Sequence, residues 1–416
     1  MSTTVCSGCG APLQTEFPDQ PGYVPVSALA REQAVCRRCF RITHYGEFSH
    51  SVVPPQEYER QLGTIVSHPG TVMYVLDVFD IPASLVSGLE RFVQSSRVVL
   101  VVNKVDLLPV DVNYLYLTKW IEQTIRHTGV NPADVVFVSA KSDIGIELLM
   151  DSVTVPGTDR VYVVGMANVG KSSILNRWLQ HAGSGKQPVF TVSKVPGTTL
   201  GLSAVDVTQP TGGTVSVVDT PGLIREGGIT HFLCPDCLQS VVPSSRLRPR
   251  VYQLNPGQTL FFGNAARLDF VAGVRQGVVC YVSNDLVIHR TKLENAQSFQ
   301  DLHQEDILRV PCAGCRQSLP WGAPTDVATA SQTPQSSRQL RSVRSSQTAR
   351  QSPRQESKVL MVPRSGCDVT LPGLGWIALS GRPFTGKLWL PSSMSPSTRP
   401  RLIGSLNRPA SKGYRA

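Results

Sequence analysis

The sequence of 416 residues lacks any long hydrophobic run. Its strongest apolar candidate, Val98–Val102, is followed at once by Asn103 and Lys104, whereas a helix that spans a bilayer needs about 20 apolar residues. The first residues also lack the basic and then apolar pattern of a signal peptide, and a transit sequence has little room before Cys6. These absences exclude a membrane protein and predict a cytoplasmic one, or an organellar one if the natural N-terminus lies upstream of Met1.

Charged residues are scarce, at 17%, and acidic residues are the scarcer kind, with 30 Asp and Glu against 40 Lys and Arg. The formal net charge of +10 favours a polyanionic partner, bound through phosphate contacts and counterion release. Hydrophobic residues make up 41% of the chain, so it can bury sizeable cores, and its length predicts roughly two or three domains.

Isolated cysteines are few, because eight of the ten fall in CxxC pairs, a spacing typical of metal sites. The four pairs are Cys6/Cys9, Cys36/Cys39, Cys234/Cys237 and Cys312/Cys315. The first two pairs predict a structural zinc site with four thiolates and no open position for water. The last two pairs either share a second zinc, which would connect two segments far apart in the sequence, or remain separate thiol pairs.

Two regions that differ in composition and hydrophobic pattern follow one another along the chain. Residues 1–48 have the composition of a small zinc finger held together by metal rather than by a core. In residues 55–240, apolar strand-like runs alternate with helical patterns. This alternation predicts an α/β domain with a mainly parallel sheet covered on both faces.

The C-terminal part predicts a mostly β (α+β) domain in two pieces, residues 246–315 and 367–400, where short β-prone runs are separated by Gly and Asn turns. Between them, residues 316–366 are dominated by Ser, Gln, Arg, Pro and Thr, which predicts a flexible basic insertion. Residues 401–416 predict a loose basic tail.

A phosphate-binding loop is predicted at Gly165-Met-Ala-Asn-Val-Gly-Lys-Ser172, between the strand-like run Val161–Val164 and a helical pattern. Lys171 would bridge the β- and γ-phosphates, and the Ser172 hydroxyl would bind magnesium. The nucleotide-binding residues expected in this loop are Gly165, Asn168, Val169, Gly170, Lys171, Ser172 and Ser173.

Asp219-Thr-Pro-Gly222 follows another apolar run. Taken alone, an Asp before Pro-Gly is more often a plain turn. About 50 residues after a phosphate loop, it becomes a Walker-B-like element in which Asp219 holds magnesium through water. The motif therefore predicts the second half of a magnesium nucleotide site.

Two further motifs, each at the end of a predicted strand, concern the base. In Asn103-Lys-Val-Asp106, the carboxylate of Asp106 could accept two hydrogen bonds from guanine that adenine cannot offer. Ser139-Ala-Lys141 would back the guanine oxygen. The alternatives are that Asn103–Asp106 only caps a helix and that Ser139–Lys141 only forms a turn. They are less favoured because four such motifs occur, each at the end of a predicted strand. The expected base contacts are Asn103, Lys104, Asp106, Ser139, Ala140 and Lys141.

Together, these four motifs resemble those of the translation-factor class of GTPases, but in an unusual order. NKxD and SAK precede the phosphate loop and DTPG, so the chain resembles a circularly permuted P-loop GTPase. In that arrangement DTPG leads directly into the C-terminal domain, which suits nucleotide-controlled movement of that domain.

The same resemblance assigns the remaining catalytic groups. Val195-Pro-Gly-Thr-Thr-Leu200 is similar to a switch loop, whose magnesium ligand is Thr199, with Thr198 as the alternative. Leu223 and Ile224 stand where many GTPases have a water-orienting Gln, which implies slow intrinsic hydrolysis. Asn168 either helps to hold a potassium ion or hydrogen-bonds within its loop. The catalytic set is Lys171, Ser172, Thr199, Asp219 and Gly222, with magnesium held by Ser172, Thr199 and Asp219.

The resemblance extends to the YqeH family over most of the chain, outside residues 316–366 and the tail. It rests on Cys6–Gly10, Pro21–Pro25 and Cys36–Tyr45, and on Pro256–Gly263, Ala266–Asp269 and Asp368–Ile377. It implies a monomer that hydrolyses GTP and assists small ribosomal subunit assembly, binding ribosomal RNA or a precursor particle through its zinc finger and C-terminal domain. The alternatives are a GTP-regulated RNA-binding protein in translation or RNA modification, and a zinc-bearing scaffold, which the intact nucleotide motifs disfavour.

Overall fold

The computed structural model describes residues 6, 11–18, 20, 22–26, 34–37, 40, 55–183, 203–208, 213–220, 228–329 and 359–403. The chain divides into two compact units, Met1–Leu247 and Arg248–Ala416. Among the described residues, no helix has both the length and the apolar character required to cross a membrane.

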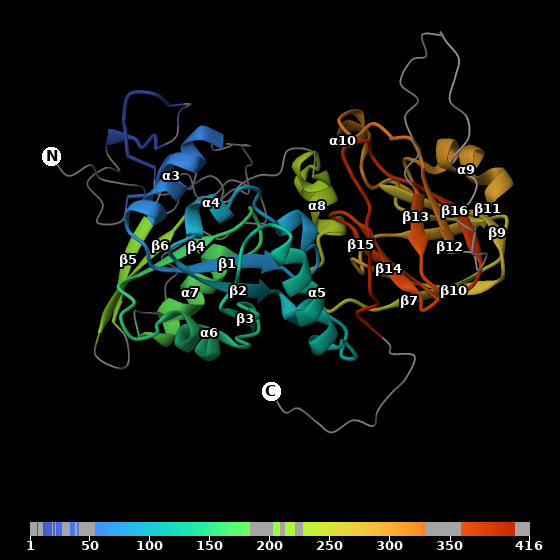
Figure 1. Ribbon diagram of the computed structural model, residues 1–416. Helices are drawn as coiled ribbons and strands as arrows, with labels where there is room; N and C mark the ends of the chain where they lie inside the picture. The colour runs from blue at the N-terminus through green and yellow to red at the C-terminus, as the bar shows by residue number, and fades with distance from the viewer. Residues whose placement is uncertain are drawn as a thin grey trace, which may run out of the picture. The chain divides into compact units, whose positions relative to one another are not determined.

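The first unit is built on a six-stranded sheet (Figure 1). Its strands are β1 (Thr71–Asp77), β2 (Arg97–Asn103), β3 (Asp134–Phe137), β4 (Arg160–Val164), β5 (Ser203–Thr208) and β6 (Thr214–Asp219), in the spatial order β3-β2-β1-β4-β6-β5. All neighbours pair in parallel except β5, which runs antiparallel to β6 at the edge. The central strands are apolar almost throughout because the parallel sheet is buried on both faces.

Helices cover this sheet on both sides. The helices of the first unit are α3 (Pro55–Ser67), α4 (Glu90–Val93), α5 (Tyr114–Arg126), α6 (Ile146–Val153), α7 (Lys171–His181) and α8 (Pro235–Val241). In Figure 1, α6 and α7 lie side by side on one face, and α3 and α4 lie on the other. The predicted α/β fold is thereby confirmed.

The helix α5 illustrates how the sequence produces these elements. The side chain of Asn113 accepts a hydrogen bond from the amide of Tyr116 and caps the helix at its start. Leu117, Ile121 and Ile125, spaced four residues apart, form its buried stripe. The cap and the spacing of the apolar residues therefore both favour a helix in the segment that connects β2 to β3 along the chain.

The strand order explains how a permuted chain can build one site. The guanine motifs follow β2 and β3, the phosphate loop follows β4, and DTPG begins at the last residue of β6. Since these four strands are parallel, all four motifs lie at the same carboxyl edge of the sheet.

The second unit is mostly β, as expected, and contains two sheets (Figure 1). One has the order β17-β14-β15-β10-β7, with strands β7 (Arg250–Leu254), β10 (Gln276–Val282), β14 (Cys367–Leu371), β15 (Gly375–Leu379) and β17 (Thr398–Arg399). The other has the order β11-β8-β9-β16-β12-β13, with β8 (Gln258–Phe262), β9 (Ala266–Gly273), β11 (Ile288–Lys292), β12 (Thr325–Thr329), β13 (Val359–Val362) and β16 (Phe384–Trp389). Its helices are α9 (Ala296–His303) and α10 (Ala313–Gln317).

The boundaries predicted for the basic insertion, residues 316–366, are wrong at both ends. Residues 325–329 form β12 and residues 359–362 form β13, and these strands pair in parallel with one another. Val327 and Val362 are buried, so both strands contribute to the core. Residues 330–358 lie outside the described part of the chain.

The predicted tail, residues 401–416, also begins too early. Leu402 and Ile403 are buried, and the amide of Leu402 donates to the Asp368 carboxylate at 3.2 Å. Burial of the apolar pair and the hydrogen bond to Asp368 on β14 hold this stretch in the fold, despite its basic surroundings in the sequence. Residues 404–416 lie outside the described part of the chain.

Candidate nucleotide-binding site

The predicted phosphate loop connects β4 to α7, which begins at Lys171. Asn168 and Gly170 adopt positive φ angles of 64° and 98°, and Gly170 is the N-cap of α7. A Cβ atom at Gly170 would lie 2.1 Å from Nδ2 of Asn103, so a glycine is required there on steric grounds as well. The loop therefore presents backbone amides at a helix N-terminus, an arrangement suited to phosphate.

Lys171 is the buried cation of this loop. Its Nζ donates to the carbonyl oxygens of Gly165 at 3.1 Å and Met166 at 3.2 Å. Burial lowers the pKa of Lys171 to about 8, although the negative charge of Asp219 acts in the opposite direction. A phosphate at the loop would restore the charge stabilisation that burial removes.

Ser172 and Asp219 lie together where a magnesium ion would bind. The Ser172 hydroxyl is 3.5 Å from Oδ2 of Asp219, and Asp219 is fully buried at the end of β6. The next residue, Thr220, is fixed by donating its hydroxyl to the carbonyl of Val163 at 2.8 Å. A hydroxyl and a carboxylate are hard oxygen ligands of the kind that magnesium prefers, so these residues fit the ion.

The rest of the predicted phosphate side lies outside the described residues. This applies to Thr198, Thr199, Gly222, Leu223 and Ile224. The roles given to Thr199 and Gly222 therefore stay predictions.

Asn103 connects the phosphate side to the base side. Its Nδ2 donates to the carbonyl of Val169 in the phosphate loop at 2.8 Å, and its Oδ1 accepts from the amide of Ala140 at 3.3 Å. Since Asn103 is buried, both bonds are shielded from water. The amide thereby fixes the distance between two loops that belong to different motifs.

Asp106 lies beside the loop that is predicted to back guanine. Its Oδ1 accepts from the Ser139 hydroxyl at 2.7 Å, and the same hydroxyl accepts from the amide of Ser142 at 3.0 Å. A carboxylate has about four lone-pair sites, so capacity remains for the two donor groups of guanine. The predicted base contacts Asn103, Asp106, Ser139 and Ala140 are thus brought together.

The two predicted lysines differ. Lys104, in the left-handed conformation with φ 67°, places its Nζ 2.5 Å from Oδ2 of Asp77. Lys141 donates instead to the carbonyl of Ser244 at 2.6 Å. Sequence reasoning missed Asp77, although one signal existed, because this Asp ends an apolar strand-like run. It pairs in register with Asn103 at the carboxyl edge of the sheet.

Half of the predicted first zinc site is described. Cys6 and Cys36 are buried in one cluster with Ala11, and the amide of Cys36 donates to Sγ of Cys6 at 3.2 Å. Such an N–H to sulfur bond is suited to a thiolate that also binds a metal. Cys9 and Cys39 lie outside the described residues, so the complete site stays a prediction.

The other four predicted cysteine ligands come together. The Sγ atoms of Cys234, Cys237, Cys312 and Cys315 all lie within 4.8 Å of one another. Four thiolates around zinc, each at about 2.3 Å, lie about 3.8 Å apart, so this four-cysteine group could hold the ion. Cys280 and Cys367 are buried instead, and burial raises their pKa values to about 12 and about 11.

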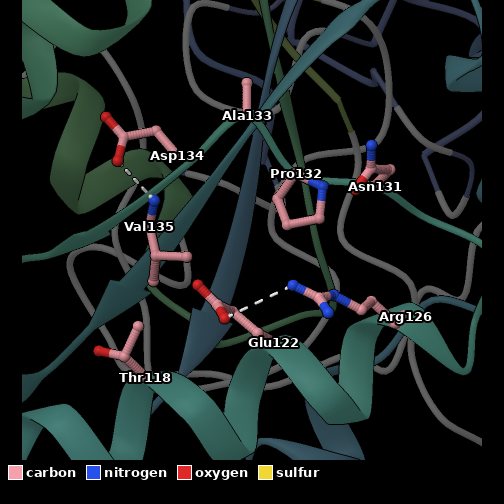
Figure 2. A pocket seen from close by; sticks show the side chains of 8 residues that line it. All are labelled: Thr118, Glu122, Arg126, Asn131, Pro132, Ala133, Asp134 and Val135. Carbon is pink, nitrogen blue, oxygen red and sulfur yellow. Dashed lines mark hydrogen bonds and ion pairs between the residues drawn. The ribbon is translucent and has the colours of Figure 1, made fainter.

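A polar pocket of about 230 Å³ lies elsewhere in the first unit (Figure 2). It is lined by Thr118, Glu122, Arg126, Asn131, Pro132, Ala133, Asp134 and Val135. Because Asp134 begins β3, the pocket is at the amino-terminal end of this strand, opposite the nucleotide motifs. Figure 2 shows the side chains of Glu122 and Arg126 paired beside it, 3.7 Å apart.

Comparison with known proteins finds relatives for both units. A family model described as 50S ribosome-binding GTPase matches residues 160–242, and a model described as YqeH-like, C-terminal, matches residues 275–335. The uncharacterized protein YqeH of Bacillus subtilis is 38% identical over 313 residues, which cover 75% of this chain and 84% of that protein.

Plant proteins match a larger share of the chain at lower identity. A putative nitric oxide synthase of Oryza sativa subsp. japonica is 27% identical over 415 residues, covering 91% of this chain and 70% of that protein. NO-associated protein 1, chloroplastic/mitochondrial, of Arabidopsis thaliana is 25% identical over 425 residues, with the same two coverages.

Proposed function

Because the chain belongs to the YqeH family of GTPases, we propose that it is a slow, GTP-controlled switch that binds ribosomal RNA and assists small ribosomal subunit assembly in the cytoplasm. The observation that carries the nucleotide part is the meeting of four motifs at one sheet edge, where Asn103 bonds to both the phosphate loop and the guanine loop. The net charge of +10 supports the RNA part.

The described residues divide the work of binding GTP. Asp106 would accept the donor groups of guanine, while Lys171 and the loop amides would bind the phosphates. Ser172 and Asp219 would hold magnesium, which neutralises phosphate charge when it is bound. Hydrolysis would then change the conformation of the DTPG segment. The chain continues from this segment into the second unit.

Slow turnover and potassium stimulation are part of the proposal. Slow turnover is supported by Leu223 and Ile224 at the positions where many GTPases have Gln. Asn168 stands in the phosphate loop with φ 64°, where its side chain is a candidate potassium ligand. We expect hydrolysis to be several-fold faster in potassium than in sodium, and Asn168→Ala to abolish this difference. Equal rates in the two salts would contradict the potassium role.

The ribosomal partner needs an experiment that acts on this GTPase alone, because a lysate contains many. Asp106→Asn replaces an acceptor with an amide that can donate to the oxygen that xanthine has in place of the guanine amine. The variant should bind xanthine nucleotides and lose guanine nucleotides. Tagged wild type and variant are then sedimented from lysate with xanthosine diphosphate or a non-hydrolysable xanthosine triphosphate analogue.

The proposal predicts that the variant migrates with small-subunit particles in the xanthosine triphosphate analogue and leaves them in the diphosphate. The wild type is the matched control, and neither xanthine nucleotide should change its migration. One matching family model is described by the 50S subunit, so migration with large-subunit particles is a real competing outcome and would overturn the subunit assignment. Absence from both particles would favour an RNA-binding switch outside assembly.

A further inference from the structure

We infer that Arg177 is a positioning residue for guanine recognition, which acts by fixing the backbone of the Ser139–Lys141 loop from the helix that begins at the phosphate loop. Arg177 lies on α7, six residues after Lys171, and its Nε donates to the carbonyl oxygen of Ala140 at 3.2 Å. The inference rests on guanine nucleotide binding at the site described above.

The backbone of Ala140 is held from two directions. Asn103 accepts its amide hydrogen at 3.3 Å, and Arg177 donates to its carbonyl oxygen. Because a peptide unit is planar and its C=O and N–H point in opposite directions, fixing the carbonyl of Ala140 also directs the amide of Lys141 away from Arg177. The orientation of the Lys141 amide, a donor available to a guanine oxygen, is therefore set.

Asp143 completes the contact between helix and loop. Its Oδ1 lies 3.5 Å from Nε of Arg177 and 2.9 Å from Nε2 of His181, one helical turn further along α7. Asp143 has a φ of 58°, a left-handed conformation that is uncommon for residues other than glycine. Such a conformation persists where surrounding contacts hold it, and here they come from one face of α7.

This arrangement joins the two halves of nucleotide recognition through one rigid element. The start of α7 would contact the phosphates, and Arg177 in its second turn bonds to the loop that would contact the base. The side chains of Arg177 and Asp143 are 32% and 42% exposed, so the cluster contributes little to folding. Its loss should therefore appear in base recognition rather than in stability.

The test compares two ligands on the full chain, GDP and inorganic tripolyphosphate, by titration calorimetry. For Arg177→Ala we expect GDP affinity to fall about tenfold and tripolyphosphate affinity to stay within about twofold. Hydrolysis should show a raised KM with kcat unchanged. Arg177→Lys, which keeps a donor and a charge, should recover part of the GDP affinity.

Arg126→Ala is the matched control. Arg126 likewise lies on a helix, α5, and pairs with a carboxylate, but it is at the opposite end of the sheet from the nucleotide motifs. It should change neither affinity. Equal weakening of both ligands by Arg177→Ala, or unchanged GDP affinity, would overturn the inference. If wild type itself fails to bind GDP, the proposed function fails instead.

Discussion

Both units bury charged side chains, but they stabilise them differently. In the first unit, Lys171 and Asp219 are buried at the carboxyl edge of the sheet, and the Lys171 ammonium bonds to two backbone carbonyls. In the second unit, Arg267 and Asp269 are buried 2.8 Å from one another on β9. The first arrangement leaves an electrostatic demand that a ligand can meet, whereas the second is satisfied within the protein.

The pair in the second unit is part of a complete network. Oδ1 of Asp269 accepts from Thr259 at 2.7 Å and from Arg267, and Oδ2 accepts from the Trp389 indole at 2.8 Å. The Arg267 guanidinium also lies over the rings of Phe261 and Trp389. Buried charge is therefore a guide to function only after its partners are known.

The largest expected effect concerns the four clustered thiols of the predicted second zinc site. Cys312→Ser should lower the zinc content of the purified chain by one equivalent and reduce the free energy of unfolding by several kcal/mol, because structural zinc contributes roughly 10 kcal/mol or more. Metal analysis and denaturant titration measure the two quantities. Cys280→Ala, at a buried cysteine outside the CxxC pairs, should keep its zinc. Unchanged zinc in Cys312→Ser would exclude this four-thiolate site.

The internally satisfied pair should matter for folding and not for nucleotide. Asp269→Ala leaves the Arg267 charge buried, so the free energy of unfolding should fall by about 3–5 kcal/mol. GDP affinity of the folded protein should stay within about twofold. The exposed Asp285→Ala is the control and should change stability by less than about 0.5 kcal/mol. A small effect of Asp269→Ala would show that the network is dispensable.

Lys171 should matter for nucleotide and not for folding, in contrast to Asp269. Lys171→Ala should reduce GTP hydrolysis by at least about 100-fold, because a positioned charge on the phosphates is lost. Thermal unfolding without nucleotide should be unchanged or shifted upward, because the desolvation cost of the ammonium disappears. Full hydrolysis by this variant would disprove the assigned role of Lys171.

The lowered pKa of Lys171, about 8, sharpens the comparison through pH. The protonated form binds phosphate, so GDP affinity should fall by up to about tenfold between pH 8 and 9, with net proton uptake on binding. The stability of the nucleotide-free protein should depend on pH in the opposite direction to GDP affinity. The folded state binds fewer protons than the unfolded state between pH 8 and 10.5, so this group makes stability rise with pH. Calorimetry in buffers of different ionisation enthalpy measures the uptake, which Lys171→Ala should lose.

The sequence was sufficient for the parts of the site that are local. The phosphate loop, the strand β4 before it and the helix α7 after it occupy adjacent residues, so pattern and spacing identify them together. The order of the guanine motifs then predicts the permuted sheet. The cysteines of the last two CxxC pairs were identified by spacing, but their meeting depends on the fold.

Contacts across long stretches of sequence could not be predicted in the same way. Asp77 reaches Lys104 over 27 residues, and Arg177 reaches Ala140 over 37, with no motif connecting either pair. The strands β12 and β13 were missed for a different reason. Each is short, and the Ser- and Arg-rich residues between them dominated the composition of the whole window.

The permuted strand order also has a consequence for how the protein is synthesised. The ribosome releases β1, β2 and β3 before β4, so the guanine-recognising half of the sheet emerges first. Until β4 follows, β1 has an open edge on a strand of buried apolar residues. Such an edge favours pairing with other chains. The nascent protein is therefore most exposed to aggregation between the release of Asp77 and that of Val164, and the phosphate-loop strand ends this period by covering β1.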